Sequence, residues 1–374
     1  MQTLIVKSTD GCNLNCCYCS VGDKKKTSNI SREVLFSTMD FVSDVCRYRD
    51  DKNLTVIFHG GEPTLIPVDY YIDSLTYFCE KNPDINISVS FQTNGFHISE
   101  EMISFWKDWN VHVGVSVDGS RDIHNRQRMT FDGKPSFDTV MNNTLRLCND
   151  GIDVSLLMVL TKNAVFSDYS FLNTFSEHHL SLKVNPLLRY GNAKSCPELF
   201  LDKGDYADFL IGMYEYILVN DLHMVVHPIN EILNCFLRKQ DRIRGCTFSD
   251  NCFSRFIAVD FSGNVFPCGR FADLNQLHLG TIYGDVKTTL GFCDFKENIL
   301  KGSSECSECK YLSVCHSGCP GERSICGSLY SKSPLCDDYY RLFSYFEVEG
   351  LKKLKRALLK KRESIMKELK RIGL

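Results

Sequence analysis

The sequence has no segment that predicts export or insertion into a membrane. Its first 13 residues, MQTLIVKSTDGCN, reach a polar stretch quickly and contain no basic start, long apolar core or cleavage site. No apolar run approaches the roughly 18 residues that a membrane-spanning helix requires. We therefore expect a cytoplasmic protein without a membrane partner.

The sequence also lacks an excess of charge of one sign. Its 374 residues carry a formal net charge of −3, so the overall charge does not indicate a nucleic-acid partner or an anionic surface. The hydrophobic content of 43% and the charged content of 24% are typical of globular proteins. The length allows one large domain or two to three smaller ones.

Cysteine, in contrast, is abundant. The chain has 19 cysteines, and in a reducing compartment such a number indicates metal or redox chemistry before disulfides. Four of them fall within residues 12–19, and most of the others lie between residues 246 and 336. The five scattered cysteines are interpreted as buried packing residues; they are Cys46, Cys79, Cys148, Cys196 and Cys235.

The first half of the chain alternates between strand and helix periodicity. Strands are predicted at 4–8, 54–61, 86–95, 111–119, 153–161 and 180–187, with helices at 32–46, 68–80, 99–108, 137–150 and 167–178. Repeated strand–helix units predict a parallel sheet with right-handed crossovers. Six such units fit a partial barrel or a doubly wound sheet, and in both the ligands bind at the C-terminal ends of the strands.

The alternation of strand and helix stops near residue 200, and this change divides the chain into three predicted parts. We expect a strand–helix domain at 1–235, a cysteine-rich domain at 236–340 that needs metal to fold, and a basic amphipathic helix at 341–374. Residues 351–374 carry ten Lys or Arg and two Glu. This helix is interpreted as a docking helix with a solvated basic face or as a surface for an acidic partner.

The first cysteine group lies in the loop that follows the first predicted strand. Cys12, Cys16 and Cys19 form a Cys-x3-Cys-x2-Cys pattern. Three thiolates in a flexible loop can hold one corner of an iron–sulfur cube and leave the fourth iron without a protein ligand. A zinc ion would require a fourth Cys or His, and the loop offers only Cys17. Because Cys17 directly follows Cys16, we interpret Cys17 as a packing residue.

This loop resembles that of the radical S-adenosylmethionine (SAM) superfamily, in which an aromatic residue, here Tyr18, precedes the last cysteine. HGGEPTL, FQTNG, GVSVDG and IHNRQR resemble further superfamily motifs and follow in the same order. The resemblance implies a partial (β/α)6 TIM-like barrel that cleaves SAM to a 5′-deoxyadenosyl radical, which abstracts hydrogen from a substrate. It implies SAM contacts at Tyr18, Gly60, Gly61, Glu62, Pro63, Asn94, Ser116, Arg128 and Leu187.

The resemblance also implies roles for several of these residues. The glycine pair lets the backbone approach SAM, Glu62 offers charge to its ammonium group, and Arg128 pairs with its carboxylate. Ser116 reaches the amino acid or ribose and Leu187 lies under the adenine, with ordinary barrel packing as the alternative for both.

A second cysteine pattern resembles the SPASM extension of peptide-modifying radical SAM enzymes, so that the resemblance covers residues 4–340. The extension holds two auxiliary clusters, which implies three [4Fe–4S] clusters in the chain. By resemblance the first auxiliary cluster takes Cys246, Cys252, Cys268 and Cys319, and the second takes Cys306, Cys309, Cys315 and Cys336. Cys293 and Cys326 are left over. A pair of structural zinc sites is the alternative.

The layout resembles that of the anaerobic sulfatase maturases, with two differences. Those enzymes have Asp, a general base, directly after the third ligand of the first auxiliary cluster, and Gln before GGEP, where this chain has Gly269 and His59. His59 is interpreted as a candidate for proton transfer or as a structural residue. The differences favour a maturase that forms a carbon–carbon or thioether cross-link within a ribosomally made precursor peptide.

Two alternatives remain open. One is sulfatase maturation, in which Cys or Ser becomes formylglycine. The other is a non-catalytic iron–sulfur protein that transfers electrons or binds a partner, but the intact GGEP turn and Arg128 argue against it. The expected partners are a precursor peptide or protein substrate and an electron donor such as flavodoxin or ferredoxin.

Overall fold

The computed structural model describes residues 1–21, 27–243, 245–294, 299 and 302–371. Its strands form a single sheet in the order β10-β9-β8-β1-β2-β3-β4-β5-β6-β7. From β8 to β7 all neighbours are parallel. The first six strands are β1 (Gln2–Lys7), β2 (Asn53–His59), β3 (Asn86–Thr93), β4 (His112–Ser116), β5 (Val154–Leu160) and β6 (Ser181–Pro186).

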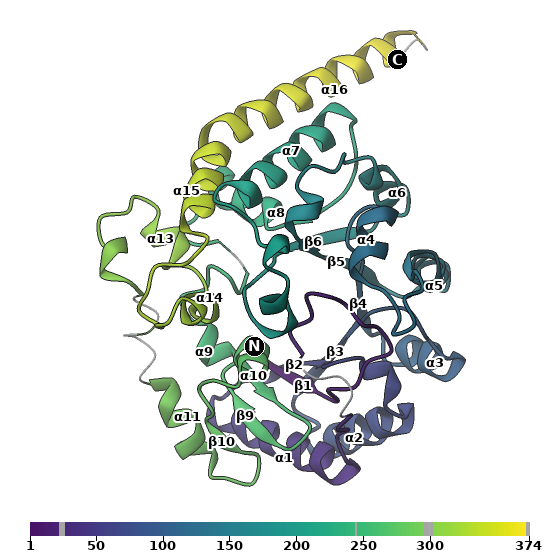
Figure 1. The fold of residues 1–374 in the computed structure, drawn as a ribbon, viewed down its shortest axis with the longest axis vertical. Coiled ribbons are helices and arrows are strands. Elements are labelled where there is room, and N and C mark those ends of the chain that lie inside the picture. Colours follow the sequence, from purple (N-terminus) through teal and green to yellow (C-terminus); the bar gives the residue numbers. More distant parts are fainter. Residues whose placement is uncertain (22–26, 244, 295–298, 300–301, 372–374) are drawn as a thin grey trace.

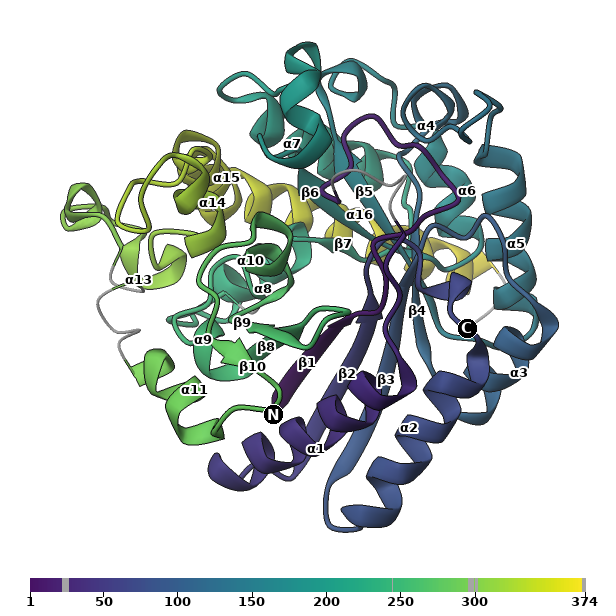
Figure 2. The ribbon, with the colours of Figure 1, turned by 60° about the horizontal axis from the view of Figure 1, so that its bottom comes forward.

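Helices connect these strands and lie on the outer side of the sheet (Figure 2). They are α1 (Arg32–Tyr48), α2 (Val68–Lys81), α3 (Glu100–Asp108), α4 (Arg121–Gln127), α5 (Phe137–Asn149) and α6 (Phe171–Glu177). Ser31 and Ser99 cap α1 and α3 by accepting hydrogen bonds from backbone N–H groups of the first turn. All eleven predicted elements are present, and the predicted partial barrel is confirmed.

The strands alternate between a packed outer face and an inner face that lines cavities. In β5, Leu156 and Met158 are buried in the core, whereas Leu157 and Val159 line a cavity. The core between sheet and helices is rich in aromatic rings, and the centroids of Phe91 and Trp106 lie 5.5 Å apart. Outward residues therefore stabilise the barrel, while inward residues remain available for ligands.

The second half of the chain extends the sheet at both edges. It contains α7 (Asp205–Val219), β7 (Val226–His227), α8 (Ile229–Leu237), β8 (Phe256–Val259), β9 (Asn264–Phe266) and β10 (Gly280–Thr281). β8 pairs with β1, and β9 and β10 follow antiparallel. The sequence did not predict these strands in the cysteine-rich part. The sheet thus crosses the boundary at residue 235, and the domain limits stay predictions.

The cysteine-rich region consists of short elements. They are α9 (Cys252–Arg255), α10 (Gly269–Leu274), α11 (Val286–Asp294), α13 (Leu312–Cys315), α14 (Pro320–Ile325) and α15 (Cys336–Tyr345). Single 3₁₀ turns occur at Pro63–Leu65, Lys162–Ala164, Gly191–Ser195, Pro197–Leu199 and Ser304–Cys306. In Figure 1 this region lies beside the β1 edge of the barrel.

The predicted C-terminal helix is present as α16 (Leu351–Arg371), joined to α15 by a π-helical turn at Phe346–Gly350. It extends away from the rest of the molecule (Figure 1), and residues 372–374 lie outside the described part. Lys353 and Lys361 form ion pairs with Glu215 and Asp221 of the α7 region. No helix in the described ranges is both long and apolar enough to cross a membrane.

Candidate active site

A cavity of about 240 Å³ lies at the C-terminal ends of the strands, and we call it the strand-end cavity. The loop after β1 contributes Cys12, Cys16 and Cys19 to its wall. The structure thus brings the predicted cluster loop to the edge of the sheet where ligands are expected. The other predicted residues on its wall are Tyr18, His59, Gly60, Gly61, Asn94, Ser116, Arg128 and Leu187.

The glycine pair after β2 allows the cysteine loop to pass close to the strand. A Cβ atom on Gly60 would overlap the carbonyl oxygen of Thr9, and one on Gly61 would overlap that of Gly11. Gly60 also has a φ of 133°, a value that side-chain-bearing residues rarely adopt. The Gly61 N–H donates to the Thr9 carbonyl at 2.7 Å. The pair therefore fixes the loop, in addition to any approach to SAM.

The Glu62 carboxylate is held by hydrogen bonds within the fold. It is fully buried, and neither Glu62 nor Pro63 lines the strand-end cavity. Its carboxylate accepts hydrogen bonds from the Thr93 hydroxyl and the Asn94 N–H, both at 2.7 Å, and from the hydroxyl and N–H of Thr64. Burial raises its pKa. Glu62 therefore positions Asn94, and its contact with the SAM ammonium stays a prediction.

A buried charge network surrounds Arg128. The Asp118 carboxylate accepts a 2.9 Å hydrogen bond from Arg128 Nε, a 3.0 Å bond from the Val159 N–H and a further bond from the Tyr18 hydroxyl. Burial alone lowers the pKa of Arg128, but Asp118 reverses this and raises it above its ordinary value. The guanidinium therefore stays charged at the cavity wall, as binding of a carboxylate requires.

A second charged pair that the sequence did not reveal borders the strand-end cavity through Asp273. Lys7 Nζ lies 2.7 Å from Asp273 Oδ1, and both side chains are nearly buried. Ser20 donates to Asp273 Oδ2 at 3.0 Å. His59 Nδ1 accepts the Gly60 N–H at 2.7 Å and lies 3.5 Å from Lys7 Nζ. Burial, and then Lys7, lower the pKa of His59 to about 3, so the ring is neutral at physiological pH.

Each predicted set of auxiliary ligands lines one further cavity. Cys246, Cys252, Cys268 and Cys319 line one of about 240 Å³, here called the Cys246 cavity. Cys306, Cys309, Cys315 and Cys336 line one of about 300 Å³, the Cys306 cavity. The structure thus brings together residues up to 73 positions apart in the first set. The ligand assignments themselves stay predictions.

The chemistry of these sets fits iron–sulfur clusters better than single ions. Every set consists only of cysteine, the donor that such clusters take. Within the described residues, no three His, Cys, Asp or Glu side chains converge closely enough to hold one metal ion. Cys17 packs beside Tyr18, and burial raises its pKa to about 11, which agrees with its interpretation as a packing residue. The side chain of Cys293 lies outside the described residues.

Comparison with known proteins identifies the family. Residues 6–168, which span β1 to the turn after β5, match the model of the Radical SAM superfamily. These residues form a radical SAM domain. Over 333 residues it is 26% identical to a cysteine-type anaerobic sulfatase-maturating enzyme of Clostridium novyi, covering 85% of this chain and 87% of that protein.

Solved structures share the fold of this radical SAM enzyme over nearly its whole length. Native anSMEcpe with bound AdoMet and Kp18Cys peptide has a TM-score of 0.80 and 24% identity, covering 95% of this chain and 99% of its own. Streptococcus suis SuiB bound to precursor peptide SuiA has a TM-score of 0.63 and 15% identity, covering 89% and 75%. The match to anSMEcpe includes the cysteine-rich region, which therefore has the predicted SPASM-type fold.

These comparisons correct the leading functional prediction. The broader expectation of a radical SAM maturase agrees with them, but they give no support to peptide cross-linking. They favour sulfatase maturation, the alternative that Gly269 and His59 had seemed to disfavour.

Sequence reasoning missed four residues that border the strand-end cavity of this radical SAM enzyme or support its wall: Lys7, Asp118, Arg270 and Asp273. Asp118 lies within the GVSVDG motif, so the sequence could have indicated Asp118 as a site residue. Asp273 lies four residues after Gly269 on the same helix, and residues at this spacing share a helix face. Arg270 donates from Nη1 to Cys319 Sγ and to Glu322 Oε1, both at 3.0 Å.

Proposed function

We propose that this radical SAM enzyme oxidises a cysteine side chain of a peptide or protein substrate to formylglycine. The observation that carries the proposal is the fold match to native anSMEcpe with bound AdoMet and Kp18Cys peptide, which covers 95% of this chain. The cysteine-type relative from Clostridium novyi, matched over most of both chains, supports the same reaction.

The strand-end cavity supplies residues suited to hold SAM. Arg128, kept charged by Asp118, would bind the carboxylate, and Asn94 and Ser116 offer polar groups nearby. Cys12, Cys16 and Cys19 would hold the cluster next to SAM. When bound, the cluster and SAM together supply a 5′-deoxyadenosyl radical, and the surrounding apolar wall excludes water from it.

The proposed oxidation requires that the substrate lose a hydrogen atom, a proton and an electron. The hydrogen atom would leave Cβ of the substrate cysteine, for which bound SAM and its cluster would supply the acceptor, and the proton would leave sulfur. The cysteines of the Cys246 cavity would hold a group of the iron–sulfur class that can accept the electron. The resulting thioaldehyde adds water and releases hydrogen sulfide, which leaves the aldehyde of formylglycine.

Asp273 is the residue that we propose as the proton acceptor. Its carboxylate lines both the strand-end cavity and the Cys246 cavity, so it lies between the two places to which hydrogen and electron go. Asp273 can take the role of an Asp that would directly follow Cys268. The helix α10 begins at Gly269, and Asp273 lies one turn later on the same helix face as Gly269. His59 is a poor candidate because its pKa is about 3 and Nδ1 already accepts a hydrogen bond.

The test is incubation of the reconstituted enzyme, under anaerobic conditions, with SAM, a reductant and synthetic sulfatase-derived peptides that contain either Cys or Ser at the reacting position. We expect 5′-deoxyadenosine and a Cys peptide that reacts with a hydrazine reagent for aldehydes. A product that has lost two hydrogens, carries no aldehyde and contains a new bond between two of its residues, located by tandem mass spectrometry, would instead establish a cross-link. SAM cleavage that no peptide stimulates would refute the proposal.

A further inference from the structure

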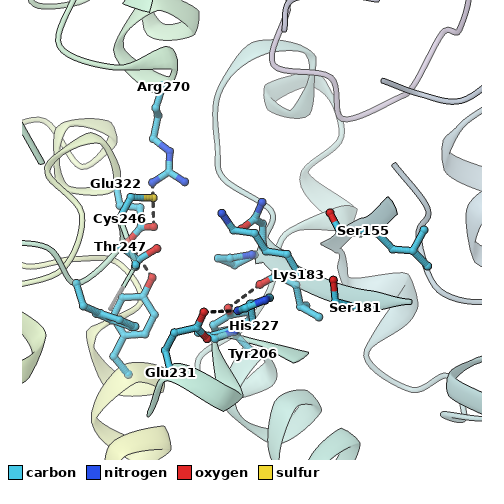
Figure 3. Close-up of a pocket in the computed structure, with 18 of the residues that line it drawn as sticks. Ser155, Ser181, Lys183, Tyr206, His227, Glu231, Cys246, Thr247, Arg270 and Glu322 are labelled. Carbon is cyan, nitrogen blue, oxygen red and sulfur yellow. Dashed lines mark hydrogen bonds and ion pairs between the residues drawn. The ribbon is translucent and has the colours of Figure 1, made fainter. Parts of the chain in front are cut away.

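A chamber of about 370 Å³ lies inside the barrel, next to the strand-end cavity. Its wall is built from the inward residues of β4, β5 and β6 and from the cysteine-rich region (Figure 3). It shares Asn185, Pro186 and Arg270 with the strand-end cavity. A substrate whose reacting residue lies beside SAM therefore has adjoining space in which its neighbouring residues can bind.

Two carboxylates, Glu231 and Glu322, line this barrel chamber, and three of their four oxygens have partners. Glu322 is buried and accepts hydrogen bonds from Arg270 Nη1 at 3.0 Å and from the Tyr339 hydroxyl at 2.9 Å. Glu231 Oε1 is in close contact with His227 Nδ1. The other oxygen of Glu231 is buried without a partner among the described residues, but it lies at the end of the chamber away from Arg270 (Figure 3).

Two cationic side chains of the chamber have hydrogen-bond donors that no described residue uses. Lys183 has neither an ion pair nor a side-chain hydrogen bond with any described residue, and Figure 3 shows it directed into the chamber. Arg270 uses only Nη1 for its bonds to Cys319 and Glu322, which leaves Nε and Nη2 without described partners. The amide of Asn185, on the shared wall, adds a further donor. These groups come from different walls of one cavity.

We propose that Lys183 and Arg270, assisted by Asn185, bind a carboxylate of the peptide substrate in the part of the chamber that borders the strand-end cavity. The proposal rests on the peptide substrate of the proposed function. A carboxylate is the group that an ammonium and a guanidinium fork recognise together through charge-assisted hydrogen bonds. The carboxylate belongs to an acidic side chain close to the reacting cysteine or to the C-terminus of the substrate.

The experiment uses synthetic peptides with one central cysteine, in which Glu, Gln or Lys replaces each neighbouring position in turn. Each peptide is made with a free and with an amidated C-terminus. Binding is measured by fluorescence anisotropy and turnover by aldehyde formation. We expect one position at which Glu binds about tenfold more tightly than Gln, a size typical of one charge-assisted contact. Tenfold weaker binding on amidation alone would identify the C-terminal carboxylate as the ligand.

Variants of Lys183 test whether the preference for a carboxylate depends on the chamber. Lys183→Met should abolish the Glu-over-Gln preference, or the effect of amidation, and Lys183→Glu should transfer the preference to the Lys peptide. The control is Lys287→Met, which changes an exposed lysine on α11. Equal affinity of wild type for all peptides, or a preference that Lys183→Met retains, would overturn the proposal. In both cases aldehyde formation by the wild type would still support the proposed function, so the two failures are distinguishable.

Discussion

Lys7 on β1 and Asp273 on α10 form an ion pair of 2.7 Å, although 266 positions separate them in the sequence. The pair lies where the barrel meets the cysteine-rich region, and Asp273 faces the cavities of both. A carboxylate held in this way is fixed in position before the substrate arrives, which is what proton transfer in an enclosed site requires.

Replacement of Asp273 by Asn should separate SAM cleavage from product formation. The variant keeps the shape and the contact with Ser20, but its amide cannot accept the substrate proton. We expect 5′-deoxyadenosine to form in the presence of the peptide while aldehyde formation falls by about a hundredfold or more, the range typical of general-base removal. Liquid chromatography with mass spectrometry measures both products.

The control for this variant is Asp285→Asn, which changes an exposed carboxylate beside α11. It should retain both activities. Undiminished aldehyde formation in Asp273→Asn, with an active wild type, would eliminate Asp273 as the proton acceptor and leave the proposed function intact.

Replacement of Asp118 by Asn should destabilise the protein and weaken SAM binding. The side chain of Asp118 is fully buried, and its charge compensates that of Arg128. Loss of one partner of a buried ion pair typically costs about 3–5 kcal/mol. We expect a lower thermal midpoint and weaker binding of SAM, measured by calorimetry on the anaerobic holoenzyme.

An exposed pair provides the matched comparison for Asp118. Asp138 contacts Arg121 at the surface, where both side chains are more than half exposed. Asp138→Asn should therefore change the free energy of unfolding by less than about 1 kcal/mol. Similar effects of the two variants would contradict the role of burial in the Asp118–Arg128 pair.

The sequence predicted those parts of the fold that have strong local periodicity. Each strand up to residue 187, and each helix except the short α4, repeats its apolar residues over enough positions to be recognised. Strands β8, β9 and β10 contain four, three and two residues, which is too short for a period to show. Their place at the β1 edge of the sheet depends on pairing between residues that are far apart in the sequence, and no local pattern predicts such pairing.

Prediction of the candidate site from the sequence was limited in the same way. The family resemblance grouped thiols that the structure places on the walls of the three cavities, although their roles as ligands stay predictions. The sequence could not predict where a carboxylate points. Glu62 turns inward to Thr93 and Asn94, whereas Asp273 reaches the cavity from a helix that was not expected to contribute.

The neutral state of His59 predicts a loss of stability in acid. Its pKa is about 3 in the folded protein, because of burial and then of Lys7, against about 6.5 in an unfolded chain. Between these values the unfolded chain binds a proton that the folded protein does not. Stability is therefore fully present above about pH 6.5 and falls below it, by at most about 1.4 kcal/mol per pH unit.

Thermal midpoints of the anaerobic holoenzyme at about pH 7.5 and pH 5.5 test this linkage. The decrease in the midpoint should be smaller for His59→Gln than for the wild type. His97→Gln, which changes an exposed histidine, should behave like the wild type. An unchanged decrease in His59→Gln would show that this ring is not the group that takes up the proton.

Iron analysis of cysteine variants tests the predicted ligand sets. Cys315 faces the Cys306 cavity, and burial, followed by the neighbouring Cys336, raises its pKa to about 12, as expected for thiols held close together. If this set holds a [4Fe–4S] cluster, Cys315→Ala should lower the iron content by about four atoms per chain. Cys326→Ala is the control, since Cys326 is exposed and lies outside the three cysteine-lined cavities.

Iron analysis also distinguishes the roles of Cys17 and Cys19 in the first cysteine loop. Cys19 faces the strand-end cavity, whereas Cys17 does not line it and packs beside Tyr18 and Leu187. Cys19→Ala should lose about four iron atoms together with SAM cleavage, because it removes one of three ligands. Cys17→Ala should keep both, since it deletes only a packing atom. Equal iron loss in the two variants would mean that the loop binds its cluster through a different set of thiols.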